Sequence, residues 1–323
     1  GLALLKRRIE QHRIDCDWAD GQMYTAIKPR QWRLLQSTHR ELEERYGYSS
    51  TRLLGPQELR AVLDSRRYLG ALYDGNSGHL HPLRYTLGLA CAAVQAGVDV
   101  YEASRVTGLI NTRGKVQAHT AAGVAECTHV LLAGGAWLDA LVPSLAHKLL
   151  TASSYMIATE PLGQQRAQAL IANHAAVCDT NWVLDHFRLS ADHRLLFGGR
   201  ISYSGARVRA AGPATVRRML KVFPQLRGIA VDHAWGCRLD LTANRAPHFG
   251  RLGPGTYFVQ GFCGHGLALA GIAGTLAAQA IAGIAERFDV FARIPHRDFA
   301  GGALLRRPLL ALAMLWYRLR DVL

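Results

Sequence analysis

The stretch that decides the fold is TYFVQGFCGHGLALAGIAGTLAAQAIAG, residues 256–283. Its apolar start predicts a buried strand, and the small residues from Gly266 onward predict a long helix. Gly261, Gly264 and Gly266 lie between the two, where glycine lets the backbone turn sharply and approach a ligand closely. A helix beginning after such a turn offers free N–H groups and its positive dipole end to an anionic or electron-rich ligand edge. The spacing is GxxGxG rather than GxGxxG, so by itself it favours a plain strand-to-helix turn.

The small-residue segment from Gly266 to Ala285 is long enough to cross a membrane, because ~20 residues at ~1.5 Å each span a ~30 Å hydrocarbon core. Its composition argues against a membrane span. It is mostly Ala and Gly, it contains Thr275 and Gln279, and it lacks an aromatic belt. We therefore expect a helix packed inside the protein and no transmembrane segment.

The composition is that of a globular protein. The chain has 323 residues, of which 49% are hydrophobic and 19% charged, enough for one large or two ordinary domains with a sizeable core. Lys and Arg outnumber Asp and Glu by 38 to 24, a net charge of +14, but they are dispersed in short pairs. A nucleic-acid-binding face would concentrate that charge and interleave it with aromatic residues. We expect solvated helix faces and no nucleic-acid partner.

The six cysteines stand far apart and form no CxxC pair, which predicts reduced thiols and a cytoplasmic protein. His79 and His81 resemble a fragment of a metal site. However, no Cys, Asp or Glu lies at a usual ligand spacing, and Pro82 follows at once. We predict a structural loop there and no metal.

Periodicity and turn residues predict the order of elements. Helices are expected over residues 1–15, over 29–46 with Gly47 as the end, after Gly55-Pro56, and from Pro82 to about Ala96. Residues 70–82 (GALYDGNSGHLHP) predict a strand, a turn and a loop. Between 98 and 132 the pattern predicts a β-meander of VDVYEA, RVTGLI, KVQAH and HVLLA. From Ser153 onward it predicts a mainly antiparallel sheet with a helix after Pro213, its strands being SYMIAT, WVLDHFRLS, LLFGGRI and DHAWGCRLDLT.

Five segments in this order resemble the D-amino-acid oxidase superfamily of FAD-dependent enzymes, and within it the gamma-glutamylputrescine oxidoreductase branch. The similarity covers nearly the whole chain. The segments are HLHPLRYTLGLACAAVQAGVDVYEASRVTGL (79–109), HVLLAGGAWLDALVPSL (129–145), RLLFGGR (194–200), AWGCRLDLTANRAPHFGRLG (234–253) and VQGFCGHGLALAGIAGTLAAQAIAG (259–283).

The resemblance implies an α/β plus α+β fold with a Rossmann-type FAD-binding domain and an antiparallel-sheet substrate domain. The FAD-binding domain takes residues 1–28, 80–150 and 250–290, the substrate domain takes 29–79 and 151–249, and 291–323 form a C-terminal helical tail. The implied activity is oxidation of a C–N bond by hydride transfer to flavin. The implied partner is a small-molecule amine, as in putrescine catabolism.

One part of the family pattern is missing from this sequence. Members of the family begin with a strand, a GxGxxG turn that holds the pyrophosphate and an acidic residue that holds the ribose. A small segment beside the flavin, rich in Gly, Ser, Arg and Asn, follows. None of these occurs here, and the first residue is Gly1. The resemblance therefore implies that the chain begins past the first βαβ unit.

The resemblance also assigns cofactor contacts. It places Val106 near the adenine, the loop of Ala133, Gly134 and Trp137 on the ADP side, and Gly261, Gly264, His265 and Gly266 at the flavin ring. For Val106 and Trp137, ordinary core packing is an equally good account. For His265 the alternative is a satisfied turn histidine.

A register argument separates amines from amino acids as substrates. In the amino-acid oxidases an Arg in the strand before a TxDxxPxxG segment binds the substrate carboxylate. Matching that segment to Thr242, Asn244, Pro247 and Gly250 places Leu239 at the Arg position. Arg238 is then its neighbour, and adjacent strand residues face opposite sides. The carboxylate clamp is absent in this register, which favours an amine.

Three further positions follow from the same resemblance. Cys237 takes the place where monomeric sarcosine oxidases attach flavin covalently, although a small inert thiol is the favoured account. His265 or His248 can remove the proton that an amine must lose before it gives up a hydride, and the sequence does not choose between them. Arg200 can face the substrate pocket or lie on the surface.

Two other functions stay open. One is an oxidase or dehydrogenase of the same superfamily that acts on a secondary amine or an amino acid. The other is a truncated, non-catalytic remnant that does not bind FAD.

Overall fold

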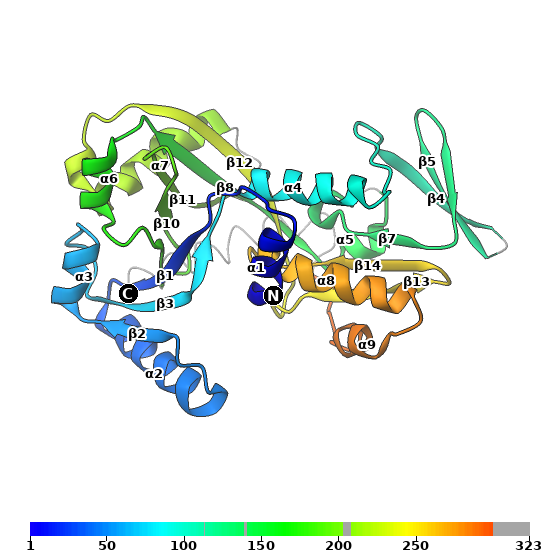
Figure 1. The fold of residues 1–323 in the computed structure, drawn as a ribbon, viewed down its shortest axis with the longest axis horizontal. Helices are drawn as coiled ribbons and strands as arrows, with labels where there is room; N and C mark the ends of the chain where they lie inside the picture. The colour runs from blue at the N-terminus through cyan, green and yellow to red at the C-terminus, as the bar shows by residue number, and fades with distance from the viewer. Residues whose placement is uncertain (113, 139–140, 203–207, 300–323) are drawn as a thin grey trace. The chain divides into compact units, whose positions relative to one another are not determined.

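The computed structural model describes residues 1–112, 114–138, 141–202 and 208–299 (Figure 1). The chain divides into two compact units. Unit 1 comprises Gly1–Ile14, Thr86–Ala152 and the described residues from Arg238 onward, whereas unit 2 comprises Asp15–Tyr85 and Ser153–Cys237. Helix α4 (Pro82–Gln95) and the strands β8 (Leu150–Thr159) and β12 (Val231–Leu241) carry the chain across the boundary.

Unit 2 is built on an eight-stranded sheet in the order β12-β8-β11-β10-β9-β1-β3-β2. The described pairings are antiparallel except for the parallel pair β1 and β9, as the absence of alternating helices predicted. The remaining strands of this sheet are β1 (Ala19–Ala26), β2 (Thr51–Leu54), β3 (Gly70–His79), β9 (Ala176–Asp179), β10 (His186–Leu189) and β11 (Leu195–Ser202).

Aromatic side chains form the centre of the unit 2 core. The ring of Phe187 on β10 stacks on that of Phe197 on β11 at 5.4 Å and meets that of Phe223 edge-on at 5.1 Å. All three residues are buried. The helices of this unit are α2 (Pro29–Tyr46), which ends at Gly47 as predicted, α3 (Pro56–Val62), α6 (Gln164–Leu170), α7 (Val208–Val222) and the short 3-10 helix η2 (Pro224–Leu226).

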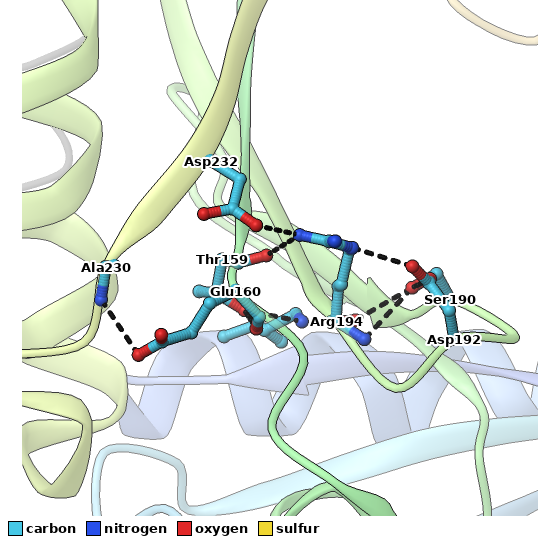
Figure 2. A network of polar contacts seen from close by, with 8 residues as sticks. Thr159, Glu160, Ser190, Asp192, Arg194, Ala230 and Asp232 are labelled. Carbon is cyan, nitrogen blue, oxygen red and sulfur yellow. Dashed lines mark hydrogen bonds and ion pairs between the residues drawn. The ribbon is translucent and has the colours of Figure 1, made fainter.

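Arg194 holds three segments of unit 2 together, as Figure 2 shows. Its guanidinium donates to the carbonyl of Thr159 at the end of β8 (2.8 Å) and to Asp192 in the turn between β10 and β11 (2.6 Å). It also pairs with Asp232 at the start of β12. One planar group therefore fixes the edge of the sheet at which β8, β11 and β12 meet.

Two buried carboxyl groups lie close together at the end of β9 in the same sheet. Asp179 at the end of β9 and Asp185 are each 2% exposed, and Arg218 on α7 donates from Nε to Oδ1 of Asp185 at 2.5 Å. Burial, with the nearby Asp185 carboxyl second, raises the pKa of Asp179 to about 7. One member of the pair thus holds a proton near neutral pH.

Unit 1 contains two three-stranded sheets and the long small-residue helix. One sheet has the order β13-β14-β7 and the other is the meander β4-β5-β6. Figure 1 shows the hairpin of β4 and β5 extending away from β7, and α8 lying along β13 and β14. The strands are β4 (Val106–Thr112), β5 (Lys115–Thr120), β6 (Val124–Cys127), β7 (Val130–Leu132), β13 (His248–Gly253) and β14 (Thr256–Gln260).

Helix α8 (Gly266–Ile281) packs against both β14 and α1 (Leu2–Gln11). It buries Ala273, Leu276, Ala277 and Ala280, whereas Leu267 is 40% exposed, so the helix packs against the protein by one face and is not enclosed on every side as predicted. Arg8 on α1 donates to the hydroxyl of Thr275 at 3.2 Å. The other helical elements of this unit are η1 (Gly135–Trp137), α5 (Pro143–Ala146) and α9 (Glu286–Ala292).

Several predicted elements differ from the structure. Residues 70–79 form one continuous strand, β3, because the glycines and polar residues fit a register shift opposite Asp20 and Gln22. VDVYEA (98–103) is not a strand, and HVLLA forms β7 in the sheet with β13 and β14, so the meander consists of β4, β5 and β6. Helix α7 begins before Pro213, which lies inside it. A helical tail was predicted for residues 291–323. In the structure α9 ends at Ala292, and residues 300–323 lie outside the described residues.

The predicted grouping of residues 1–28 divides between the two units. Gly1–Ile14 lies in unit 1, whereas β1 pairs with β3 and β9 of unit 2. Residues 238–249, grouped by sequence with the second domain, lie in unit 1. What each unit binds stays a prediction.

Among the described residues, no single helix combines the length and the apolar character needed to cross a membrane. Helices α8 and α9 meet that requirement only together, and they are bent by 119° relative to each other.

The proton on Asp179 gives the stability of the protein a pH dependence. The folded state binds this proton more tightly than the unfolded chain, so the free energy of unfolding should fall as pH rises from about 4 to 7, by at most ~1.4 kcal/mol per pH unit. Asp179→Asn should flatten the profile in this range, as measured by urea unfolding at a series of pH values.

The matched control is Asp192→Asn. The carboxyl of Asp192 is exposed, and a hydrogen bond from Ser190 is the main cause that lowers its pKa. Asp192 therefore stays ionised above pH 5 in the folded and the unfolded protein. Its removal should leave the slope between pH 5 and 7 unchanged. Parallel profiles for wild type and Asp179→Asn would show that Asp179 is ionised throughout.

Candidate functional site

Two glycine turns of unit 1 lie at the same edge of one sheet. β7 and β14 pair in parallel, with Leu132 opposite Phe258, so their carboxyl ends point the same way. Ala133, Gly134 and the 3-10 helix η1 follow β7, whereas Gly261 and the turn to α8 follow β14. The parallel register therefore brings together the two segments that the sequence assigned to a cofactor.

The carboxylate of Asp240, near the end of β12, is bonded to the Gly261 turn and lies close to Gly135 of the other turn. Oδ2 of Asp240 accepts a hydrogen bond from the backbone N–H of Gly261 at 2.7 Å. The backbone carbonyl of Asp240 accepts one from the N–H of Cys263 at 3.1 Å. A Cβ on Gly135 would lie 2.8 Å from the same Oδ2, and one on Gly261 would lie 2.5 Å from Cγ2 of Thr242. Both glycines also have positive φ, +49° and +77°, so the turns require glycine for space and for conformation.

The outer side of β7 borders a pocket of about 610 Å³. Three residues that the sequence assigned to the ADP side, Val106, Ala133 and Trp137, line it, and Gly134 follows Ala133 directly. Trp137 is 71% exposed, and the guanidinium of Arg238 lies 4.6 Å from the centre of its ring. The pocket also includes Arg105, Thr107, Leu109, Ala118, Val130, Leu131, Leu132, Leu138 and Leu141.

The turn before α8 is open at Gly264. Gly264 has φ +89°, and no heavy atom lies within 4 Å of the position of a Cβ there. His265 is exposed, and its backbone N–H donates to the carbonyl of Phe262 at 2.9 Å. No side chain caps α8, so its first N–H groups are available to a ligand.

His248, at the start of β13, pairs with Gln260 next to the Gly261 turn and belongs to a partly buried cluster. Its Nδ1 is 3.1 Å from Nε2 of Gln260, which also donates to the carbonyl of Leu145 at 3.2 Å. Because the amide nitrogen can only donate, Nδ1 of His248 accepts, and the ring carries its proton on Nε2. Burial first, then His296 and Lys148, lower the pKa of His248 to about 4, so this ring is neutral at physiological pH.

The two remaining predicted site residues, Arg200 and Cys237, belong to unit 2. Arg200 pairs with Tyr155 in the ladder of β11 and β8, and its side chain lies outside the described part of the structure. Cys237 lies in β12, where partial desolvation raises the pKa of its thiol. That environment does not favour the nucleophilic thiolate.

Sequence reasoning missed Asp240 and Gln260. Asp240 stands in a mixed polar strand, RLDLT, where no local pattern marks it, although it lies two residues before Thr242 of the quoted segment. Gln260 is the last residue of the apolar run TYFVQ, and it is fully buried. A polar residue at the buried end of such a strand is the one signal that the sequence offered.

Metal ligands are not gathered at these turns. In the ranges that the structure describes, no group of three or more His, Cys, Asp or Glu residues is placed to hold a metal ion.

Comparison with known proteins finds close relatives. The chain is 39% identical over 322 residues to the gamma-glutamylputrescine oxidoreductase of Escherichia coli, an alignment covering 99% of this chain and 75% of that protein. It is also 39% identical over 325 residues to a protein of Haemophilus influenzae named "Probable oxidoreductase OrdL", covering 99% and 74%.

Solved structures share the fold at low identity. Glycine oxidase from Bacillus cereus superposes with a TM-score of 0.75 at 19% identity, covering 91% of this chain and 81% of the other. L-proline dehydrogenase from P. horikoshii gives 0.74 at 17% identity, covering 87% and 77%.

Residues 1–280 match the model of a protein family described as "FAD dependent oxidoreductase". This match spans both glycine turns and nearly all of α8. The chain therefore belongs to the family of FAD-dependent oxidoreductases.

Proposed function

We propose that this oxidoreductase oxidises the carbon–nitrogen bond of an amine, and that gamma-glutamylputrescine is the substrate to test first. The observation that carries the proposal is the 39% identity, over 99% of the chain, to a gamma-glutamylputrescine oxidoreductase. In the overall reaction an amine, water and dioxygen give an aldehyde, ammonia and hydrogen peroxide.

The residues of unit 1 fit an FAD molecule on two counts. The pocket beside β7 has an aromatic and aliphatic lining suited to a flat ring system, and its volume of about 610 Å³ is ordinary for a small-molecule site. The uncapped start of α8 suits the electron-rich edge of a second ring. FAD, when bound, supplies the hydride acceptor.

We assign the contacts to FAD as the sequence suggested. Val106, Ala133, Gly134 and Trp137 hold the ADP side, and Gly261, Gly264, His265 and Gly266 hold the flavin side. The N–H groups and dipole at the start of α8 stabilise negative charge there. Asp240 has an indirect, positioning role in this assignment. Its carboxylate binds the N–H of Gly261 and lies close to Gly135, so it supports both turns without touching FAD.

Of the two histidines, we assign the role of proton acceptor to His265. It is exposed and stands directly before the first residue of α8. Nδ1 of His248 already accepts from Gln260, and burial keeps its pKa near 4, which leaves it a poor base at neutral pH. A place for Arg200 in the substrate pocket stays a prediction.

The surroundings of Arg238 support an amine rather than an amino acid. Its guanidinium stacks on Trp137, and Asp240, two residues on and on the same face of the strand, binds Gly261. Leu239 between them faces the opposite side. The position that carries the carboxylate-binding Arg in amino-acid oxidases is therefore apolar.

A cytoplasmic location remains part of this proposal. All six cysteines are free thiols, which is consistent with a reducing compartment. No covalent link of Cys237 to flavin is proposed, because the pKa of its thiol is raised.

Gly264→Ala tests the flavin-side turn. A side chain at φ +89° is strained by roughly 1 kcal/mol and projects into the open space where the ligand approaches, so the purified variant should bind FAD more weakly. The measurement is a titration of the protein with FAD followed by flavin absorbance. Gly274→Ala, inside α8 with equal space around it, should bind as the wild type does. A wild-type chain that binds no FAD would support the remnant alternative instead.

Asp240→Ala tests the link between the turns. Removing the acceptor leaves the N–H of Gly261 without its partner and should lower the free energy of unfolding by about 1–3 kcal/mol, together with FAD affinity. Asp240→Asn keeps an acceptor oxygen and should lose less. Urea unfolding and FAD titration measure the two effects. Equal FAD affinity in Asp240→Ala and wild type would show that the Gly261 turn does not contribute to FAD binding.

A substrate panel tests the reaction. With FAD bound, gamma-glutamylputrescine should give more peroxide per unit time than glycine, sarcosine or D-alanine, because the strand before Thr242 offers no carboxylate-binding Arg at position 239. Peroxide release is followed with a coupled peroxidase assay. Strong turnover of amino acids with none of amines would overturn the amine assignment.

A further inference from the structure

A second pocket lies wholly within unit 2. It has a volume of about 740 Å³, and it forms where the loop after α3 meets the end of α7 and η2. Its lining consists of Ile27, Asp64, Ser65, Arg66, Arg67, Lys221, Val222, Pro224 and Gln225. The proposed function uses none of these residues, and both glycine turns belong to unit 1.

The charged groups of this pocket are unequal in number. Arg66, Arg67 and Lys221 carry three positive charges, whereas Asp64 is the one acidic residue in the lining. The Oδ2 atom of Asp64 already accepts from Nε2 of Gln225 at 3.0 Å. Within the lining, positive charges outnumber negative ones by three to one, although the buried Asp185 carboxyl beyond it also interacts with Arg67 and Lys221. The remaining positive charge favours an anionic ligand.

Arg67 supplies a donor without an acceptor. Its Nε atom is buried and has no hydrogen-bond partner among the described residues. The nearby Asp185 carboxyl attracts Arg67 electrostatically but makes no hydrogen bond to Nε, and its Oδ1 accepts from Arg218 at 2.5 Å. A buried N–H without a partner is unfavourable, and a small shift of the guanidinium toward a ligand oxygen in the pocket would remove that penalty.

The pocket wall is fixed in place before any ligand binds. The hydroxyl of Ser65, itself 5% exposed, donates to the carbonyl of Val222 at 2.7 Å and accepts from the N–H of Arg67. Nε2 of Gln225 also donates to the carbonyl of Asp64 at 2.9 Å. These bonds join the loop that carries Arg67 to the end of the helix that carries Lys221, so little ordering is needed on binding.

We propose that this pocket binds a small multivalent oxyanion, held by the guanidinium of Arg67 and the ammonium of Lys221. The planar guanidinium matches the oxygens of a carboxylate or a phosphate equally well, and the volume suits a metabolite-sized molecule. A phosphate compound and a polycarboxylate share this chemistry, and the experiment separates them.

The test is calorimetric titration of the FAD-saturated protein at constant ionic strength, with pyrophosphate in one arm and citrate in the other. Saturating FAD keeps pyrophosphate out of the flavin site. We expect one saturable site for at least one of the two anions. Lys221→Gln, at an exposed position, should weaken binding by about tenfold, and Arg67→Gln by at least as much.

Arg217→Gln is the matched control, because Arg217 is exposed on the same helix and does not line the pocket. It should leave the affinity within about twofold of the wild type, as a surface charge does. Equal weakening by Arg217→Gln and Lys221→Gln would mean diffuse attraction to a basic protein and would overturn the proposal. Absence of saturable binding with both anions would overturn it as well. Neither result bears on the oxidation of amines.

Discussion

The parallel pairing of β7 with β14 is the constraint on which the candidate site depends. It sets two glycine turns, far apart in the sequence, at one edge of one sheet. The carboxylate of Asp240 binds the N–H of Gly261 and occupies the space where a side chain at Gly135 would lie, whereas Thr242 occupies that space at Gly261. A ligand that uses both turns therefore meets backbone N–H groups whose spacing is fixed by hydrogen bonds rather than by flexible side chains.

The sequence predicted the elements whose ends carry strong local signals. Helix α2 ends at Gly47 and α4 begins at Pro82, because glycine and proline determine the backbone at those positions. The long helix after the glycine turn was also predicted. By contrast, the polar segment within residues 70–79 forms strand through its pairing with β1, and VDVYEA has the composition of a strand without its structure. Tertiary pairing decides both cases, and composition cannot show it.

The sequence predicted the glycine turns of the candidate site and the pocket residues Val106, Ala133 and Trp137, but not the polar side chains that hold the turns. Glycines at the two turns stand out in the sequence, so their positions were found. Asp240 and Gln260 act through contacts with residues up to 115 positions away along the chain, and no local pattern reveals such a partner. The same limit applies to His248, which the sequence offered as a base and which the structure places as a neutral acceptor for Gln260.

The cysteines have a consequence for an enzyme of the proposed kind. Burial raises the pKa of Cys16 and takes that of Cys178, beside the two buried carboxyl groups, to about 12, and the pKa of Cys237 is raised too. These three thiols stay protonated at neutral pH, and peroxide attacks the thiolate rather than the thiol. For the proposed oxidase, the raised pKa values lower the thiolate fraction at these three positions and so slow their oxidation by the peroxide that the proposed reaction releases.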